Sequence, residues 1–460
     1  MHRYLIFATA GLSLLMYAID STVVAVAFPN FTRDLHTNVL WSAWTISIFF
    51  IAVTMAIPLA GNLGDSFGRK KVFLVSLMLF TASSLACGLA PTIYALIAFR
   101  FLQGIGGACF FPSASGIVSD HFPENREAAI GLFSSIYSVG AVIGPNLGGW
   151  LVSRYSWRYI FYINVPIGML LMGSIMLLLK ESRIFSRPRV DLVGAALMSG
   201  ALVFFMFGLN LVGESFSTPS IFFAALFVFV SLFLAVLFLR QEKRAAQPIL
   251  DIALLQSTPF MAANVVNLIV GMTMIGVFSF IPLYATSIHK LSTLMSGVIL
   301  TPRSLAMAIA AAITSFFLKT WGYRWPMVLG FGLVSFTTIL LAPGLSPWGI
   351  AGVRWGTIET LSLLLLLNGM GGGVVFPAAN NACIELMPEK VGTIVGLRIM
   401  FRNVGAALGI SLITFILHVS PDPGSGFNIA FISFGLAFLL SIPLLFFMPA
   451  GRKAWAGKLT

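Results

Sequence analysis

The chain has 460 residues, of which 58% are apolar and only 9% are charged, whereas about a quarter of the residues in a soluble domain carry charge. This composition excludes a soluble globular protein and indicates one that lies largely within a membrane. The net charge of +12 does not indicate nucleic-acid binding, because the basic residues are spread over short segments between long apolar stretches.

A bilayer core about 30 Å thick requires about 20 apolar residues per helix. Charges, prolines and glycines divide the chain into fourteen such stretches, which start near residues 4, 41, 72, 93, 128, 158, 192, 220, 259, 294, 325, 359, 392 and 428. The connections between them are too short to form a soluble domain. We therefore expect an all-α polytopic membrane protein with 14 transmembrane helices.

The basic residues predict how these helices are oriented. If the loops alternate between the two sides, eighteen of the 27 Lys and Arg residues fall on the side of the N-terminus and five fall opposite. Cytoplasmic loops carry the excess of basic residues, so we expect both termini in the cytoplasm. The four remaining arginines lie within predicted helices: Arg100, Arg303, Arg398 and Arg402.

The first predicted helix contains Asp20, the only one of the fifteen acids that we expect deep in the membrane. An ionisable residue there is costly and indicates a functional site with a partner. Asp20 lies nine residues before Pro29, and Arg100 lies nine residues after Pro91. At a rise of 1.5 Å per residue, both are about 14 Å from the outer boundary, so we expect them to pair.

Such a pair can bind and release a proton. Burial favours the neutral form of a carboxyl group, whereas a nearby cation favours the charged form. Moving water or Arg100 toward and away from Asp20 would therefore drive proton uptake and release. The alternative interpretation is a static ion pair that only fixes how the helices pack.

The loop between the second and third predicted helices combines glycines, one acid and three cations, in the sequence Gly61-Asn62-Leu63-Gly64-Asp65-Ser66-Phe67-Gly68-Arg69-Lys70-Lys71. It closely resembles the corresponding loop of the major facilitator superfamily of transporters. The resemblance implies that Asp65 faces the start of the thirteenth helix near Gly392, that Arg69 pairs with Asp120, and that these contacts cross between the two halves. The implied cytoplasmic gate comprises Gly61, Asp65, Gly68, Arg69 and Asp120.

The fifth predicted helix carries a glycine pattern formed by Gly140, Gly144, Pro145, Gly148 and Gly149. Small residues at this spacing let helices approach closely, and a proline bends a helix. The pattern resembles a superfamily motif associated with antiporters, which implies exchange rather than symport. Close packing without any mechanistic role is the alternative. The segment 157–168 resembles a hallmark of the drug-exporting branches, and we interpret it as structural.

An internal repeat organises the chain. A shift of 265 positions places Gln103–Gly107 on Asn368–Gly372, and Gly140 and Gly144 on Gly405 and Gly409. Parallel repeats of this kind place a substrate site between two halves. We predict a six-helix bundle at residues 1–185, two extra helices at 186–258 and a second six-helix bundle at 259–460. This 6+2+6 order resembles the drug/proton antiporter branch of the superfamily.

Several polar residues in predicted helices are candidates for lining a substrate cavity. With no acid predicted deep in the C-terminal half, its arginines would make the cavity positive, unless they bond backbone carbonyls or face the loops. The candidates are Tyr17, Asn264, Arg303, Asn380, Arg398 and Arg402.

The resulting functional hypothesis is a proton-coupled antiporter that exports amphipathic small molecules by alternating access. Alternatives are an exporter of anionic, zwitterionic or lipid-like substrates, and a proton-independent facilitator or lipid scramblase. The five histidines are scattered, so we expect neither an enzyme nor a metal site, and no cofactor besides the proton gradient. The expected partners are an amphipathic substrate, protons and lipid, without nucleic acid. We expect a monomer in the bacterial inner membrane.

Overall fold

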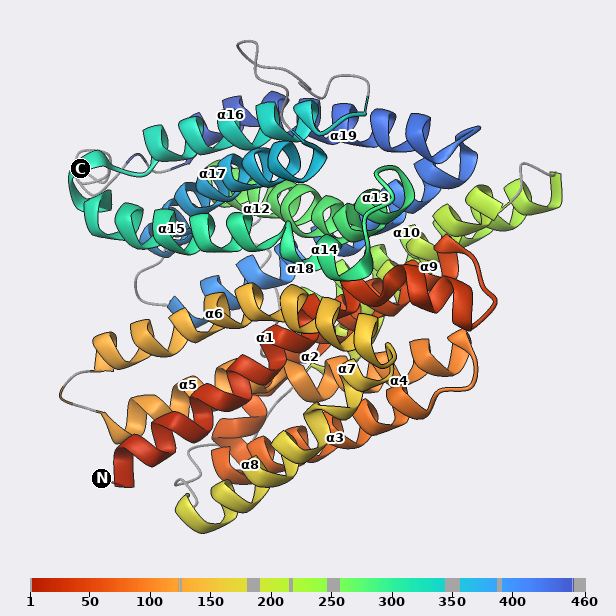
Figure 1. Cartoon of the computed structure of the whole chain (residues 1–460). Coiled ribbons are helices and arrows are strands. Elements are labelled where there is room, and N and C mark those ends of the chain that lie inside the picture. The colour runs from red at the N-terminus through yellow and green to blue at the C-terminus, as the bar shows by residue number, and fades with distance from the viewer. Residues whose placement is uncertain are drawn as a thin grey trace. The chain divides into compact units, whose positions relative to one another are not determined.

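The computed structural model describes residues 2–122, 124, 126–179, 191–214, 218–245, 257–343, 356–386, 391–448 and 450. Every regular element in these ranges is a helix (Figure 1). Eleven of the described helical stretches are long and apolar enough to cross a membrane, and shorter apolar helices occur at Ala196–Gly208 and Arg324–Leu340. The predicted all-α polytopic architecture is confirmed, whereas the count of fourteen crossings stays a prediction.

The helices form two compact units, of which the first comprises Met1–Phe207 and Ala225–Ile249. Its helices are α1 (His2–Asp34), α2 (Val39–Phe67), α3 (Arg69–Leu89), α4 (Ile93–Ala108), α5 (Phe110–His121), α6 (Arg126–Arg154), α7 (Tyr159–Tyr162) and α8 (Asn164–Leu178). Most of α9 (Leu192–Glu214) and α10 (Thr218–Glu242) also belongs to this unit. In it, Phe207 of α9 packs on Trp44 of α2, with ring centroids 4.6 Å apart.

The second unit comprises Gly208–Ala224 and Leu250–Thr460. Its first membrane stretch is irregular: α12 (Thr258–Gly271) continues into the π-helix η2 (Met272–Gly276), the 3-10 helix η3 (Val277–Phe280) and α13 (Ile281–Ser287). The remaining elements are α14 (Thr293–Val298), α15 (Thr301–Trp321), α16 (Arg324–Leu340), α17 (Thr357–Leu386), α18 (Val391–Val419), α19 (Pro423–Leu440) and η5 (Ile442–Phe447).

Prolines explain two breaks in the first unit. A proline ring inside a helix clashes with the carbonyl group four residues earlier. Four residues before Pro112 is Ala108, where α4 ends, and four residues before Pro166 is Tyr162, where α7 ends. The second break makes Asn164 the first residue of α8, and this residue belongs to the site described below.

The internal repeat is visible in the backbone of each unit. Gly68 between α2 and α3 has φ 95°, and Gly322 between α15 and α16 has φ 69°, a region that glycine enters without steric cost. Gly106 of α4 lies against the α3 backbone, since an added Cβ would be 2.7 Å from Phe80 N. Its repeat partner Gly371 lies in the same way against α16, 2.9 Å from Gly330 O. Each unit thus repeats the same helix packing.

Candidate functional site

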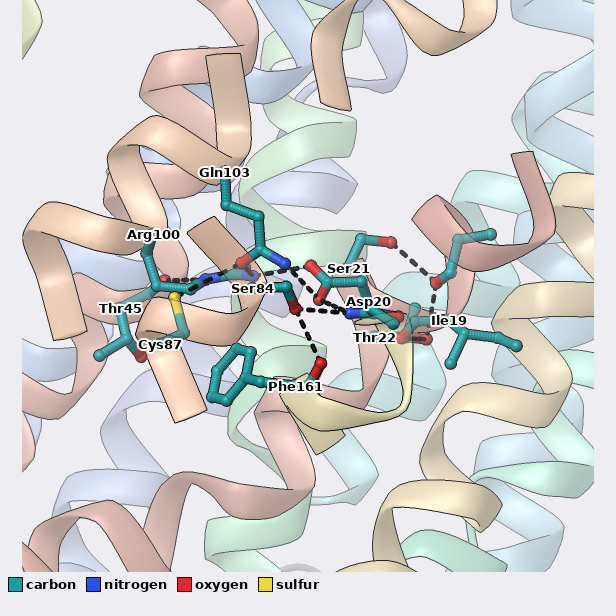
Figure 2. A network of polar contacts seen from close by, with 12 residues as sticks. Ile19, Asp20, Ser21, Thr22, Thr45, Ser84, Cys87, Arg100, Gln103 and Phe161 are labelled. Atoms are coloured by element: carbon teal, nitrogen blue, oxygen red, sulfur yellow. Dashed lines mark hydrogen bonds and ion pairs between the residues drawn. The ribbon is translucent and has the colours of Figure 1, made fainter. Parts of the chain in front are cut away.

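The principal polar site of the first unit surrounds Asp20 on α1 (Figure 2). Its carboxylate accepts three hydrogen bonds. Arg100 Nη1 donates to Oδ2 at 2.7 Å, and Gln103 Nε2 and Asn164 Nδ2 donate to Oδ1 at 2.8 and 2.9 Å. The structure therefore brings together Asp20 and Arg100, as the sequence predicts, and adds two amide side chains.

Arg100 of α4 is bonded on several sides. Its Nε donates to the backbone oxygen of Thr45 at 3.1 Å, and Nη1 also donates to Gln103 Oε1 at 2.8 Å. The guanidinium carbon lies 4.1 Å from the ring centroid of Phe49, a favourable cation–π arrangement. The charge of Arg100 is thus balanced by Asp20 and further stabilised by dipoles and an aromatic face.

A second layer of contacts fixes the amides. Asn164 Nδ2 also donates to Ser84 Oγ at 3.0 Å, and Ser84 Oγ donates to Phe161 O at 2.9 Å. The Cys87 thiol points to Gln103 Oε1 at 3.7 Å. These contacts tie α3, α7 and α8 to the carboxylate on α1, and a buried network with its polar groups satisfied is rigid.

The site is closed to solvent. Asp20 and Gln103 are 0% exposed, and Arg100 and Asn164 are 1% exposed. A charge pair in such a low-dielectric position interacts more strongly than one in water. Because the carboxylate is fully buried in this conformation, any exchange with solvent at Asp20 would require the surrounding helices to separate.

Sequence reasoning missed Gln103 and Asn164 as ligands of the carboxylate. In the sequence, Gln103 stands out as part of the repeat and as a neighbour of Arg100, and Asn164 belongs to the segment 157–168 that we interpret as structural. One signal was available for Gln103, because a residue three positions after Arg100 shares its helix face. Asn164 depends on the break before α8, which directs its side chain to Asp20.

The glycines of α6 position the part of α1 that carries Asp20, and these two helices run side by side (Figure 1). A Cβ at Gly140 would lie 2.5 Å from Ala18 Cβ, and one at Gly148 would lie 2.6 Å from Val23 Cγ2. A Cβ at Gly144 would overlap Thr22 Oγ1. No side chain fits at these contacts. The other two residues of the motif, Pro145 and Gly149, are also buried in α6.

The predicted cytoplasmic contact between Arg69 and Asp120 is present. Arg69 Nη1 lies 2.8 Å from Asp120 Oδ2, and the two side chains are 22% and 48% exposed. Gly116 leaves room for the guanidinium group, because a Cβ there would lie 3.0 Å from it. The expectation that this contact crosses between halves is wrong, since α3 and α5 belong to the same unit. The surroundings of Gly61, Asp65 and Gly392 lie outside what the structure describes.

The second unit has a partly buried cation of a different kind. Arg303 of α15 donates from Nε to Asn368 Oδ1 at 3.3 Å and from Nη2 to Met274 O at 3.1 Å. Its guanidinium carbon lies 3.9 Å from the Phe278 ring centroid. Asn368 is the repeat partner of Gln103, so the amide is retained, but among the described residues no carboxylate pairs with Arg303.

The other cavity candidates differ in their surroundings. Tyr17 packs against Phe49 and Tyr137, with ring centroids 5.9 and 6.2 Å apart. Asn264 is buried and donates to Phe260 O in its own helix. In contrast, buried side-chain atoms that lack a hydrogen-bond partner are found in Asn380, Arg398 and Arg402.

Sequence comparison identifies the family. The profile of the Major Facilitator Superfamily matches residues 10–191, 182–410 and 263–458. The chain belongs to this superfamily. Multidrug resistance protein 3 of Bacillus subtilis (strain 168) is 33% identical over 405 residues, which cover 87% of this chain and 77% of that protein. The Tetracenomycin C resistance and export protein of Streptomyces glaucescens is 30% identical over 432 residues, with coverage of 91% and 78%.

The solved structures agree with this assignment at the level of the fold. A crystal structure of the peptide transporter POT superposes with a TM-score of 0.71 at 17% identity, covering 96% of this chain and 95% of that one. Together with the apolar helices, membership of the Major Facilitator Superfamily makes this protein a multi-pass membrane transporter rather than an enzyme.

Proposed function

We propose that this member of the Major Facilitator Superfamily is a proton-coupled antiporter that exports amphipathic small molecules. The observation that carries the proposal is the buried Asp20 carboxylate, held by Arg100 and two amides. The names of the two relatives, which refer to resistance and export, support the direction of transport. The proposed arrangement has fourteen spans, both termini in the cytoplasm and one chain per transporter, in a bacterial inner membrane.

Protonation of Asp20 would change its contacts. The charged carboxylate only accepts hydrogen bonds, whereas a protonated carboxyl group carries an O–H that must donate. In the structure, Oδ1 already accepts from Gln103 and Asn164, whereas Oδ2 accepts from Arg100 and keeps one accepting position for a proton. A proton on Oδ2 would neutralise the carboxylate and replace its charge-assisted contact with Arg100 by a weaker one. Proton binding would thereby loosen the hold of α4 on α1 and couple protonation to helix movement.

The transport cycle follows from this coupling. An outside proton reaches Asp20 when the site is open outward, and the substrate leaves. The neutral carrier turns inward, releases the proton and re-forms the pair with Arg100. One proton moving inward across a potential of 100 mV supplies about 2.3 kcal/mol, and a pH gradient adds to this. The glycines of α6 would support the exchange of substrate for protons because they allow α1 to pack closely against α6.

Inverted membrane vesicles with an imposed pH gradient test the proposal. Wild-type protein should drive accumulation of rhodamine 6G, and Asp20→Asn should abolish the gradient-driven part. The matched control is Asp34→Asn, because Asp34 pairs with Arg33 at the surface, and this variant should transport like wild type. Equal gradient-driven transport by Asp20→Asn and wild type would refute proton coupling through Asp20 and favour a facilitator.

A further inference from the structure

Two arginines on α18 differ from Arg100 and Arg303 in their hydrogen bonds. Arg398 and Arg402 are four residues apart and share one helix face. Each is partly exposed, yet the Nε of each is buried without a hydrogen-bond partner. Arg100 and Arg303, in contrast, donate to several oxygens. Within the described ranges, neither arginine on α18 pairs with a carboxylate.

The neighbouring face of α17 offers groups that suit an organic ligand. Arg402 Cζ lies 6.0 Å from the Phe376 ring centroid, and Arg398 is close enough to Cys383 for an electrostatic interaction. Asn380 is four residues after Phe376 and three before Cys383, so it lies on the same face of α17. Its Oδ1 is also buried without a partner. Rotation of this amide would present two N–H donors to an anion.

The arrangement is unfavourable without a ligand. Like charges four residues apart on a helix repel each other, and Arg398 and Arg402 do interact electrostatically. A buried N–H without an acceptor also costs free energy. Glu385, the described acid next along α17, forms no ion pair with either arginine, and its Oε2 has no partner. An anionic group would relieve both the repulsion and the missing acceptors, and Phe376 would contact an attached apolar body.

We propose that Arg398 and Arg402, assisted by Asn380 and Phe376, bind the anionic group of an amphipathic organic solute, such as a carboxylate or sulfonate. The inference rests on the proposed function, since it names a class of substrate for the exporter. Planar anionic groups suit guanidinium because it can donate two parallel hydrogen bonds. The substrates of this transporter accordingly include organic anions or zwitterions.

Dye binding to the purified full-length protein tests the site without any gradient. Sulforhodamine B and rhodamine 6G share a xanthene ring system but have opposite net charge. Replacing both arginines with glutamine should weaken sulforhodamine B binding about tenfold or more, as expected for the loss of charge-assisted hydrogen bonds. Rhodamine 6G binding should not weaken. Arg33→Gln, which alters an exposed arginine, should leave both affinities unchanged.

The outcomes separate the possibilities. Unchanged sulforhodamine B binding by the double variant, or equal loss of both dyes, would overturn the proposal. Replacing both arginines with lysine keeps the charges and should retain most of the binding, and retained rhodamine 6G binding by the glutamine variant excludes unfolding as the cause of its loss. If the wild type binds no sulforhodamine B while phosphatidylglycerol raises its unfolding temperature through these arginines, the site is a lipid site and the solute assignment is wrong. Dye binding needs no pH gradient, whereas the test of proton coupling measures gradient-driven transport, so failure of this inference and failure of proton coupling are distinguishable.

Discussion

Replacing Asp20 with asparagine should destabilise the protein strongly as well as uncouple it. Arg100 is 1% exposed, and removing one partner of a buried ion pair costs about 3–5 kcal/mol because the other charge is left unpaired. Asparagine cannot take over the three hydrogen bonds. Its single amide oxygen can face either Arg100 or the two amide donors, and its NH₂ group then points at a donor on the other side.

The double variant Asp20→Asn/Arg100→Gln distinguishes coupling from static packing. Removing both charges eliminates the unpaired cation, so the double variant should be more stable than Asp20→Asn by about 2 kcal/mol. The assay is the free energy of unfolding in a reversible detergent–denaturant titration, combined with pH-driven export in inverted vesicles. As a control, Asp34→Asn at the exposed pair with Arg33 should lower the free energy of unfolding by less than about 1 kcal/mol.

The two interpretations differ in what the double variant recovers. A pair that only holds helices together predicts that stability and pH-driven export return together. A pair that carries the proton predicts that stability returns and pH-driven export does not. Export by the double variant at the wild-type rate, and with the wild-type dependence on the pH gradient, would refute our reasoning.

Three further predictions concern the surroundings of this pair and a helix cap. Gly144→Ala should lower the free energy of unfolding by about 1–3 kcal/mol through overpacking against α1. Adding Thr22→Ala to this variant should partly restore the free energy of unfolding. Gly173→Ala should have little effect, because an added Cβ there meets nothing within 4 Å. Asn164→Ala should raise the pH at which export is half-maximal, because it removes a donor to the charged carboxylate. The control Asn264→Ala removes an amide that donates within its own helix and should leave that pH unchanged. An unchanged pH for Asn164→Ala would contradict its assigned role. Hydrogen bonds from the backbone and side chain of Ser425 lower the pKa of Asp422 from 3.8. The stabilisation that Asp422 provides as N-cap of α19 should therefore be complete above pH 3.8 and be lost as the pH falls through the lowered pKa. Asp422→Ala should reduce the unfolding temperature at neutral pH but not in strong acid, and an equal reduction at both pH values would contradict the role of the cap.

Much of the first unit could be predicted from sequence because its signals are strong. A single deep acid and a single deep arginine at matched distances from prolines leave few pairings, and Asp20 and Arg100 do meet. The glycine positions also carry direct geometric information, since close helix contacts tolerate no larger side chain. The Arg69–Asp120 contact followed from family resemblance, and its location within one unit could have been predicted, because both residues fall in the predicted bundle at residues 1–185.

The partners of the buried groups were harder to predict. Asn164 reaches Asp20 because Pro166 ends α7 and starts a new helix, a local break that an apolar pattern does not show. In the second unit, Arg303 bonds Met274 O where the chain forms a π-helix. A change of helix type shifts which residues face a neighbour, so a register derived from a regular helix cannot place such contacts.

The most direct test of the central claim is proton release on substrate binding to purified protein in unbuffered solution. Adding rhodamine 6G should make wild-type protein release protons in proportion to the bound dye, because in our proposal an outgoing substrate and an incoming proton alternate at Asp20. Asp20→Asn has no titratable group at this position and should release none for the dye that it binds. Equal proton release by this variant and wild type would contradict the assignment of Asp20 as the coupling residue.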